Sequence, residues 1–243
     1  METVHRFPLP IVRSPQLKIW RYLTPSKFLG LLDDRSLFFP NTELFEDPFE
    51  GAYPDANRAL QDHIFANYPV TEDQQKAARD FYKWNKHLTF VSCWHLSEHE
   101  SDALWKIYGK TEKAVLIQST YLRLKSCLPN YVHIHPVTYI DYKVDRIPNG
   151  HSMYPFFFKR REFKYENELR AATGDLPISD HVRRVRISDN GWSFPINVNK
   201  LIESVYVAPE CPEETYICIK NASLQRGLVA PVLPSSLDAQ PRF

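Results

Sequence analysis

Two glutamates two residues apart, Glu166 and Glu168, have the type and spacing that proton-transfer or electrostatic chemistry requires. The apolar residues after them predict a strand over 168–173, and side chains on a strand return to the same face every two residues. Adjacent carboxylates repel each other unless they are exposed, paired with cations, or used in binding or catalysis. Arg170 continues the same face, so an exposed, salt-bridged strand is the alternative.

Two earlier segments carry further candidates. The run Lys18–Leu23 is rich in β-favouring residues and predicts a strand that holds Arg21 and Tyr22. The run Leu88–Trp94 predicts another strand, which ends with Ser92 and Trp94. The planar guanidinium of an arginine suits phosphate or ribose oxygens, and aromatic rings stack on planar bases.

The order of these parts, an Arg on the first strand, a Ser ending a later strand and a late Glu-x-Glu, resembles the R-S-E class of ADP-ribosyltransferases. The serine segment reads Val91-Ser92-Cys93, where that class has S-T-S. The resemblance implies an ADP-ribosyltransferase-like fold and NAD as co-substrate. It predicts an NAD-cleaving ADP-ribosyltransferase or an NAD glycohydrolase.

The resemblance also implies a role for each candidate. Glu168 opposes the positive charge that develops as the nicotinamide bond breaks, and Glu166 orients or deprotonates an acceptor. Arg21 holds a phosphate or ribose oxygen, and Ser92 braces Glu168. The rings expected to stack on nicotinamide or adenine are those of Tyr22 and Trp94.

Longer stretches resemble a bacterial family known only as a domain of unknown function, over most of residues 18–230. They are Phe45-Glu-Asp-Pro-Phe-Glu-Gly51, Ser92-Cys-Trp94 with Glu100 to Tyr108, Lys159 to Arg170, and Leu201 to Pro209. This family implies no activity. A second hypothesis is therefore a non-enzymatic module that binds nucleic acid or a protein.

Basic and aromatic runs favour that second hypothesis. Lys159-Arg-Arg161 and Arg183-Arg-Val-Arg186 could hold phosphates, with Tyr154 and Phe156–Phe158 close by in the sequence. The alternative is a solvated face above a core strip of aromatic residues, and Phe156–Phe158 are predicted to be core.

Metal and nuclease sites are less well matched. His95-Leu-Ser-Glu98-His99 has the H-x-x-E-H pattern of inverted zinc peptidases. However, Ser97 is expected to cap a helix, which would leave His95 outside it, so we predict no metal. A D…E-x-K nuclease would need a lysine where Arg170 stands, and arginine does not lose its proton.

The composition limits the remaining classes. The chain has 243 residues, 30 Lys+Arg, 29 Asp+Glu, 43% hydrophobic residues, 19 Pro and 7 Gly. The near-zero net charge makes no whole-molecule field for polyanions, and the scarcity of Gly argues against glycine-rich phosphate loops. Irregularly spaced cysteines, no signal peptide and no long apolar run predict reduced thiols, no membrane partner and a cytoplasmic location.

Short alternating elements predict one α+β domain with mixed or antiparallel sheets and flanking helices. We expect an extended arm over 1–16, the domain over 17–234 and a tail over 235–243. Strands are expected at 18–23, 36–39, 88–94, 113–118, 131–140, 168–173, 182–187 and 204–208. Helices are expected after Thr24, within 55–86 with a break at Tyr68-Pro69, from Ser97, and at 122–128 and 213–219.

Overall fold

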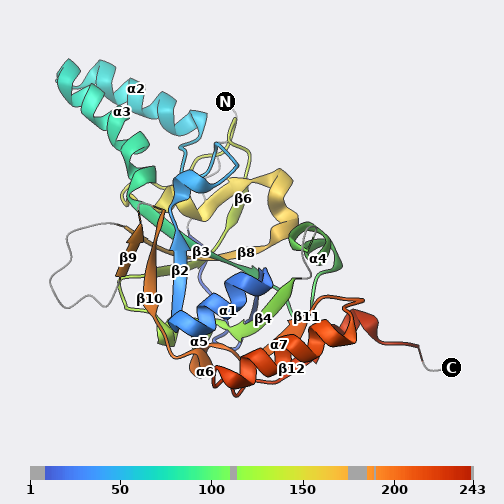
Figure 1. Ribbon diagram of the computed structural model, residues 1–243. Coiled ribbons are helices and arrows are strands. Elements are labelled where there is room, and N and C mark those ends of the chain that lie inside the picture. The colour runs from blue at the N-terminus through green and yellow to red at the C-terminus, as the bar shows by residue number, and fades with distance from the viewer. Residues whose placement is uncertain (1–8, 110–113, 175–184, 189, 242–243) are drawn as a thin grey trace.

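The fold is taken from a computed structural model, which describes residues 9–109, 114–174, 185–188 and 190–241. A seven-stranded sheet dominates it, in the order β12-β11-β4-β1-β3-β8-β5 (Figure 1). Neighbouring strands are antiparallel, except for the parallel pair β11 and β12 at one edge. The strands are β1 (Lys18–Leu23), β3 (Thr89–Leu96), β4 (Val115–Thr120), β5 (His133–Pro136), β8 (Glu168–Gly174), β11 (Ser204–Val207) and β12 (Val232–Pro234).

Two smaller sheets and several helices surround it. One sheet has the order β2-β10-β9 and the other pairs β6 with β7. The elements are β2 (Ser36–Pro40), β6 (Thr138–Ile140), β7 (Phe158–Arg160), β9 (Val185–Ser188) and β10 (Gly191–Pro195), with α1 (Pro25–Asp34), α2 (Asp55–Asn67), α3 (Glu72–His87), α4 (Asp102–Tyr108), α5 (Tyr121–Cys127), α6 (Val198–Leu201) and α7 (Glu213–Gln225). Four 3₁₀ helices are η1 (Thr42–Leu44), η2 (Tyr154–Phe157), η3 (Arg161–Glu166) and η4 (Ser236–Asp238). The predicted mixed α and β architecture built on mainly antiparallel strands is confirmed.

Helix α1 forms for the reasons the sequence suggests. The hydroxyl of Thr24 accepts a hydrogen bond from the backbone N–H of Lys27, and Pro25 takes the first helical position. Phe28 is fully buried on the apolar face of this helix, which ends at Arg35 in a left-handed conformation with φ 45°. The strand that follows, β2, does not join the sheet of β1 but pairs with β10.

The two faces of the large sheet are covered differently. The first face carries Ile19, Trp94 and Leu169, and it packs into the largest apolar cluster together with α1 and the β2-β10 pair. The second face carries two separate clusters, one around Phe156–Phe158 and one around Trp105. Between these two clusters the side chains of Cys93 and His95 on β3 are only half-buried. The candidate site lies there.

Several predicted boundaries were wrong. Ser97 does not cap a helix: β3 runs to Leu96, and the hydroxyl of Ser101 caps α4 by accepting from the N–H of Leu104. The predicted strand over 131–140 is two strands, because Pro136 ends β5 and β6 belongs to another sheet. Positions 182–184 of another predicted strand lie outside the described residues.

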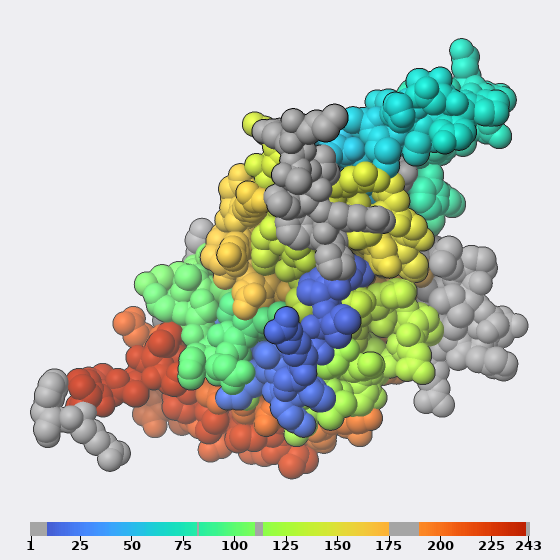
Figure 2. All heavy atoms as spheres, turned by 180° about the vertical axis from the view of Figure 1, so that it is seen from behind, coloured from blue at the N-terminus to red at the C-terminus, as the bar shows by residue number. Residues whose placement is uncertain are grey.

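Described residues near both ends of the chain lie against the body of the protein. Described residues of the arm run over the surface beside α5 and β5, where they appear in blue in Figure 2, and the N–H of Tyr121 donates to the carbonyl of Leu17. At the other end, Ser235 is 3% exposed and its hydroxyl donates to Glu100. The 3₁₀ helix η4 follows Ser235, within the range expected to be a tail. Among the described residues, no helix is long and apolar enough to cross a membrane.

Candidate functional site

A cluster of five charged side chains lies on the second face of the sheet. It consists of Glu50, Lys159, Glu166, Glu168 and Arg170, which we call the charge cluster. Three carboxylates face two cations, so the cluster carries one net negative charge when all five groups are ionised. Its members come from the turn after η1, from β7, from the end of η3 and from β8.

Arg170 is the centre of the charge cluster. It is 1% exposed, and all five of its N–H donors are used. Nε and Nη2 donate to Glu168 at 2.8 and 3.1 Å, and Nη1 and Nη2 donate to Glu50 at 2.6 and 2.9 Å. The remaining Nη1 donor binds the carbonyl of Phe156 at 2.8 Å. This geometry makes Arg170 a fully satisfied buried cation that holds two carboxylates in place.

Lys159 connects the buried part of the cluster to its surface. Its Nζ lies 2.8 Å from Glu168, 2.5 Å from Glu166 and 3.4 Å from Glu50. Burial by itself would lower the pKa of Lys159, but the carboxylates, Glu168 first, outweigh burial and raise that pKa above its ordinary value. Lys159 is therefore a permanent ammonium ion in this site.

Glu50 reaches the cluster because of the turn that follows it. Gly51 has φ 73°, a left-handed conformation, and a Cβ at this position would lie 2.3 Å from the ring of Phe156. Only glycine allows the backbone to pass this close to Phe156. The Asp-Pro-Phe-Glu-Gly segment is thus the turn that the sequence predicts, with Asp47 accepting from the N–H of Phe49 at 3.0 Å. Its glutamate, however, is part of the charge cluster.

Glu166 and Glu168 come together in a different way from the one predicted. Glu166 is not on the strand but is the last residue of η3, and Asn167 turns the chain into β8 with φ 39°. Asn167 is fastened to β3, where it donates to the carbonyl of Leu96 at 2.5 Å and accepts from the N–H of Leu96 at 2.7 Å. The two carboxylates meet because this turn folds Glu166 back, not because they share a strand face.

The environments of the two glutamates drive their pKa values in opposite directions. Burial raises the pKa of Glu166, a hydrogen bond with Glu168 adds to this, and the pKa reaches about 7. Burial also acts to raise the pKa of Glu168, but Arg170 and Lys159 overcome it and hold this pKa well below the ordinary value. At neutral pH Glu168 is ionised, whereas Glu166 is close to its titration midpoint.

Glu166 is also the more accessible of the pair. Its side chain is 16% exposed, against 6% for Glu168. Both oxygens of Glu168 already accept hydrogen bonds from Arg170, and one also accepts from Lys159. A ligand can therefore reach Glu166 more readily than Glu168.

Aromatic side chains form a wall beside Glu166. Tyr108 of α4 is 50% exposed and stacks on Tyr22 of β1 with ring centroids 5.8 Å apart. Burial raises the pKa of Tyr108, and the nearby charge of Glu166 raises it further. Burial also raises the pKa of Tyr22 to about 12. In Figure 2 the gold residues of η3 lie against the green residues of α4 on this side of the molecule.

Cys93 also lies on the second face, directly opposite Arg170 in the pairing of β3 with β8. Burial and the neighbouring Glu168 raise its pKa above the ordinary thiol value. A thiol in this state is a poor nucleophile.

The structure separates three of the four predicted cofactor residues, Arg21, Ser92 and Trp94, from the glutamates. The Nη1 of Arg21 donates to the hydroxyl of Ser92 at 2.6 Å, and the guanidinium lies 5.7 Å from the ring centre of Trp94. Trp94 belongs to the apolar cluster of the first face, whereas Glu168 shares the second face with its register partner His95. The single Arg, Ser and Glu cleft that the sequence predicts is therefore not formed.

Two individual roles need correction for the same reason. Ser92 does not brace Glu168, because its hydroxyl is fully buried on the other face and accepts from Arg21 and Trp94. Arg21 and Tyr22 are consecutive on β1, so their side chains point to opposite faces, and of these two only Tyr22 is near Glu166. Burial lowers the pKa of Arg21 to about 10.

The sequence did not indicate that four residues, Glu50, Lys159, Tyr108 and His95, belong to the same site as Glu166 and Glu168. Lys159 was grouped with a basic run, and Tyr108 was considered as the end of the segment Glu100 to Tyr108. A buried cluster of opposite charges has no local signature, since Glu50 and Arg170 lie 120 positions apart. The alternation along β3 did place Cys93 and His95 on one face, and this signal was available.

The basic run Lys159–Arg161 does not form a free cationic patch. Arg160 pairs with Asp47 at 3.0 Å, and Arg161 pairs with Asp145 at 2.8 Å. Arg183 and Arg184 lie outside the described residues. Phe156, Phe157 and Phe158 are fully buried, as predicted for core residues. Because these cations already pair with carboxylates, the run Lys159–Arg161 does not support the hypothesis that the chain contacts phosphates.

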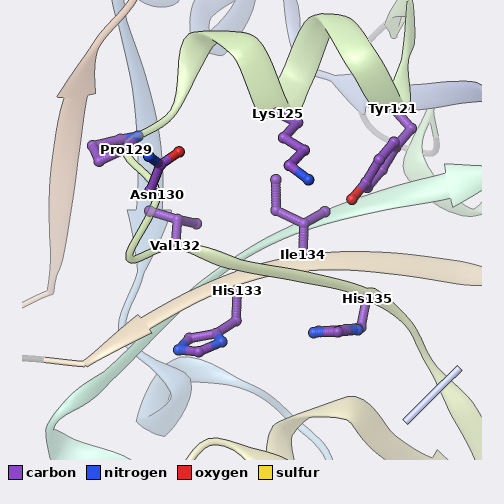
Figure 3. Close-up of a pocket in the computed structure, with 8 residues that line it drawn as sticks. All are labelled: Tyr121, Lys125, Pro129, Asn130, Val132, His133, Ile134 and His135. Atoms are coloured by element: carbon purple, nitrogen blue, oxygen red, sulfur yellow. The ribbon is translucent and has the colours of Figure 1, made fainter. Parts of the chain in front are cut away.

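Four histidines, His95, His99, His133 and His135, lie on strands or just after one. His95 is on β3 and His99 follows that strand, so the two imidazoles of the H-x-x-E-H pattern do not share a helical face. His133 and His135 share a face of β5 and line a pocket of about 220 Å³ at the sheet edge, together with Tyr121 and Lys125 of α5 (Figure 3). Burial lowers the pKa of both His133 and His135. This pocket is separate from the accessible carboxylate of Glu166.

Compared with protein-family models, with curated proteins and with solved structures, the chain has no match. The two resemblances described from the sequence therefore stay predictions. The structure places the accessible carboxylate of Glu166, whose pKa is raised, beside the buried carboxylate of Glu168. The rings of Tyr22 and Tyr108 form the aromatic wall next to them.

Proposed function

We propose that the chain cleaves the N-glycosidic bond of NAD, as an ADP-ribosyltransferase or an NAD glycohydrolase, through Glu166. The observation that carries the proposal is the arrangement of the two carboxylates, since Glu166 is 16% exposed whereas both oxygens of Glu168 are held by Arg170 and Lys159. The raised pKa of Glu166 and the lowered pKa of Glu168 support it. Two neighbouring carboxylates whose environments separate their pKa values are the arrangement expected for acid–base and glycosyl-transfer chemistry. The mainly antiparallel sheet, with Glu168 at the start of β8 and Glu166 at the end of η3, supports an ADP-ribosyltransferase-like fold as part of the same proposal.

The proposed roles differ from those that the resemblance implies. Glu168 positions the site, because its oxygens are occupied by Arg170 and Lys159. Glu166, the accessible carboxylate, opposes the positive charge that grows on the ribose as nicotinamide leaves. The aromatic wall of Tyr22 and Tyr108 would hold a planar ring next to it.

The proposal is tested by incubating the protein with NAD and measuring released nicotinamide. Glu166→Gln keeps the size of the side chain but removes its charge, and it should lower the rate by about 100-fold or more. Glu162→Gln, on the same 3₁₀ helix but exposed, is the matched control and should retain the wild-type rate. Equal turnover by wild type and Glu166→Gln would reject the assignment.

A second candidate function is a protein-interaction module, which the hairpin of α2 and α3 favours. This hairpin projects from the body of the molecule (Figure 1). Its large apolar side chains are partly in solvent, with Tyr68 64%, Trp84 57% and Ile64 39% exposed. Sedimentation of the wild type and of a Tyr68→Ser/Trp84→Ser variant over a range of concentrations tests self-association. If both proteins are monomers at every concentration, the hypothesis that the chain associates with itself is rejected.

A further inference from the structure

One step of the proposed reaction has no residue assigned to it so far. The acceptor, whether water or a hydroxyl on another molecule, must lose a proton as it bonds to the ribose. Glu168 is occupied by cations and Glu166 is assigned to the developing charge. We infer that His95 is the base that takes the acceptor proton, an inference that rests on the proposed function and adds a catalytic residue to the same site.

The hydrogen bond of His95 determines which ring nitrogen is free. Its Nδ1 lies 2.6 Å from the backbone carbonyl oxygen of Glu166. A carbonyl oxygen only accepts hydrogen bonds, so Nδ1 must carry the proton and Nε2 must hold the lone pair. Within the described part of the chain, Nε2 has no hydrogen-bond partner. A ring fixed at one nitrogen by a backbone carbonyl, with a free lone pair at the other, is oriented to accept a proton.

The position of His95 brings this lone pair into the site. In the pairing of strands it lies opposite Glu168 of β8 on one side and Trp20 of β1 on the other. It shares the second face with Cys93 and is half-buried, between the two apolar clusters of that face. Its contact with the carbonyl of Glu166 also makes it a direct neighbour of the residue that opposes the ribose charge.

The surroundings keep His95 neutral at physiological pH. The ionisable side chains on the same face of the flanking strands are Lys18 and Tyr22 on β1 and Glu168 and Arg170 on β8, and Lys18 lies 3.7 Å from Glu98. Burial lowers the pKa of His95, and the hydrogen bond to the carbonyl of Glu166 only partly opposes this. The unprotonated imidazole is therefore the main form at pH 7, as a base requires.

The bonds in the proposed step balance without any further reactant. The bond between ribose C1′ and the pyridinium nitrogen breaks, and its electron pair leaves with nicotinamide, which becomes neutral. An oxygen lone pair of the acceptor forms the new bond to C1′. The acceptor proton moves to Nε2 of His95, and the resulting imidazolium returns it to solvent.

Nicotinamide release by His95→Asn at pH 8 tests the assignment. The asparagine amide can still donate to the carbonyl of Glu166 but has no nitrogen lone pair. We expect a rate about 100-fold below wild type, with the KM for NAD little changed, because a general base typically contributes this much. Added imidazole should restore part of the rate, which it would not do for a purely structural residue. His99→Asn, at an exposed histidine, is the matched control and should behave as wild type.

The outcomes separate this inference from the proposed function. If wild type releases no nicotinamide, the proposed function and the role of His95 both fail. If Glu166→Gln is inactive while His95→Asn stays within about threefold of wild type, only the role of His95 is overturned. His95→Gln serves if His95→Asn does not fold. Nitrogen NMR of the wild-type ring gives a check without substitution, since a proton on Nε2 instead of Nδ1 at pH 8 would overturn the assignment.

Discussion

At the scale of single residues, the site depends on how a few charges are buried together. Arg170 pairs with Glu50 and Glu168 at the same time, and together with Lys159 it compensates their desolvation. The sequence indicated that Glu166, Glu168 and Arg170 are neighbours along the chain. It did not indicate that Glu50 is the second partner of Arg170, because ion pairing between distant segments leaves no local pattern.

Removing Arg170 should be far more damaging than removing an exposed arginine. Arg170→Met keeps a comparable side-chain length but leaves Lys159 as the one cation beside two buried carboxylates, and it should cost about 3–5 kcal/mol of unfolding free energy. Arg79→Met breaks the pair with Asp62, whose side chains are 58% and 67% exposed, and should cost at most about 1 kcal/mol. Urea unfolding of both variants measures the difference. Similar losses for the two would show that the charge cluster does not hold the fold together.

At the scale of elements, alternation along the strands decides which side chains can share a site. Consecutive residues such as Arg21 and Tyr22 lie on opposite faces, as do Ser92 and Cys93. The strands β1, β2, β3, β4, β8 and β11 lie close to their predicted bounds, because β-favouring residues and turn residues mark them locally, whereas β7, β10 and β12 were not predicted. The end of η3 was not predicted, since the left-handed turn at Asn167 depends on its bonds to Leu96 of β3.

In the α2 and α3 hairpin an apolar residue is exposed while its polar neighbour is buried. Trp84 is 57% exposed, whereas Asn85 is 7% exposed and donates to the carbonyl of Ser152 at 2.7 Å. Trp84→Ser should therefore change the unfolding free energy by no more than about 0.5 kcal/mol. Asn85→Ala should cost about 1–3 kcal/mol, because a buried carbonyl loses its donor. Thermal or urea unfolding of the two variants checks this order, and a larger loss for Trp84→Ser would contradict the structure.

At the scale of the whole molecule, the two glutamates make stability depend on pH in opposite ways. The pKa of Glu168 lies well below its ordinary value of 4.5, so its contribution is present above that pH and is lost as the pH falls. The pKa of Glu166 is raised to about 7, so the folded state binds more protons than the unfolded state between about pH 4.5 and 7. The contribution of Glu166 to stability therefore decreases as the pH rises through that window.

Glu166→Gln isolates this effect. Glutamine does not titrate, so the variant should gain stability relative to wild type between pH 5 and pH 8, by about 1–3 kcal/mol. Buried histidines such as His133 have lowered pKa values and act in the opposite direction in both proteins, so the difference between the two curves is the quantity to measure. Urea unfolding at pH 5, 6, 7 and 8 provides the curves. Parallel curves would mean that the pKa of Glu166 is not raised in the folded state.

The sequence by itself determined most of the helices and strands and the types of side chain available for chemistry. It predicted the mixed architecture, the cap of α1 at Thr24, the strands β1, β3, β4 and β8, and the glutamate pair, because capping, turn and β propensities act over a few residues. Only the tertiary structure decided which of these side chains meet. Strand register placed Arg21 and Ser92 on the face away from Glu168, and packing across more than a hundred residues brought Glu50 to Arg170. These contacts between distant residues depend on the free energy of the whole packed structure, and no single segment of the chain determines that free energy.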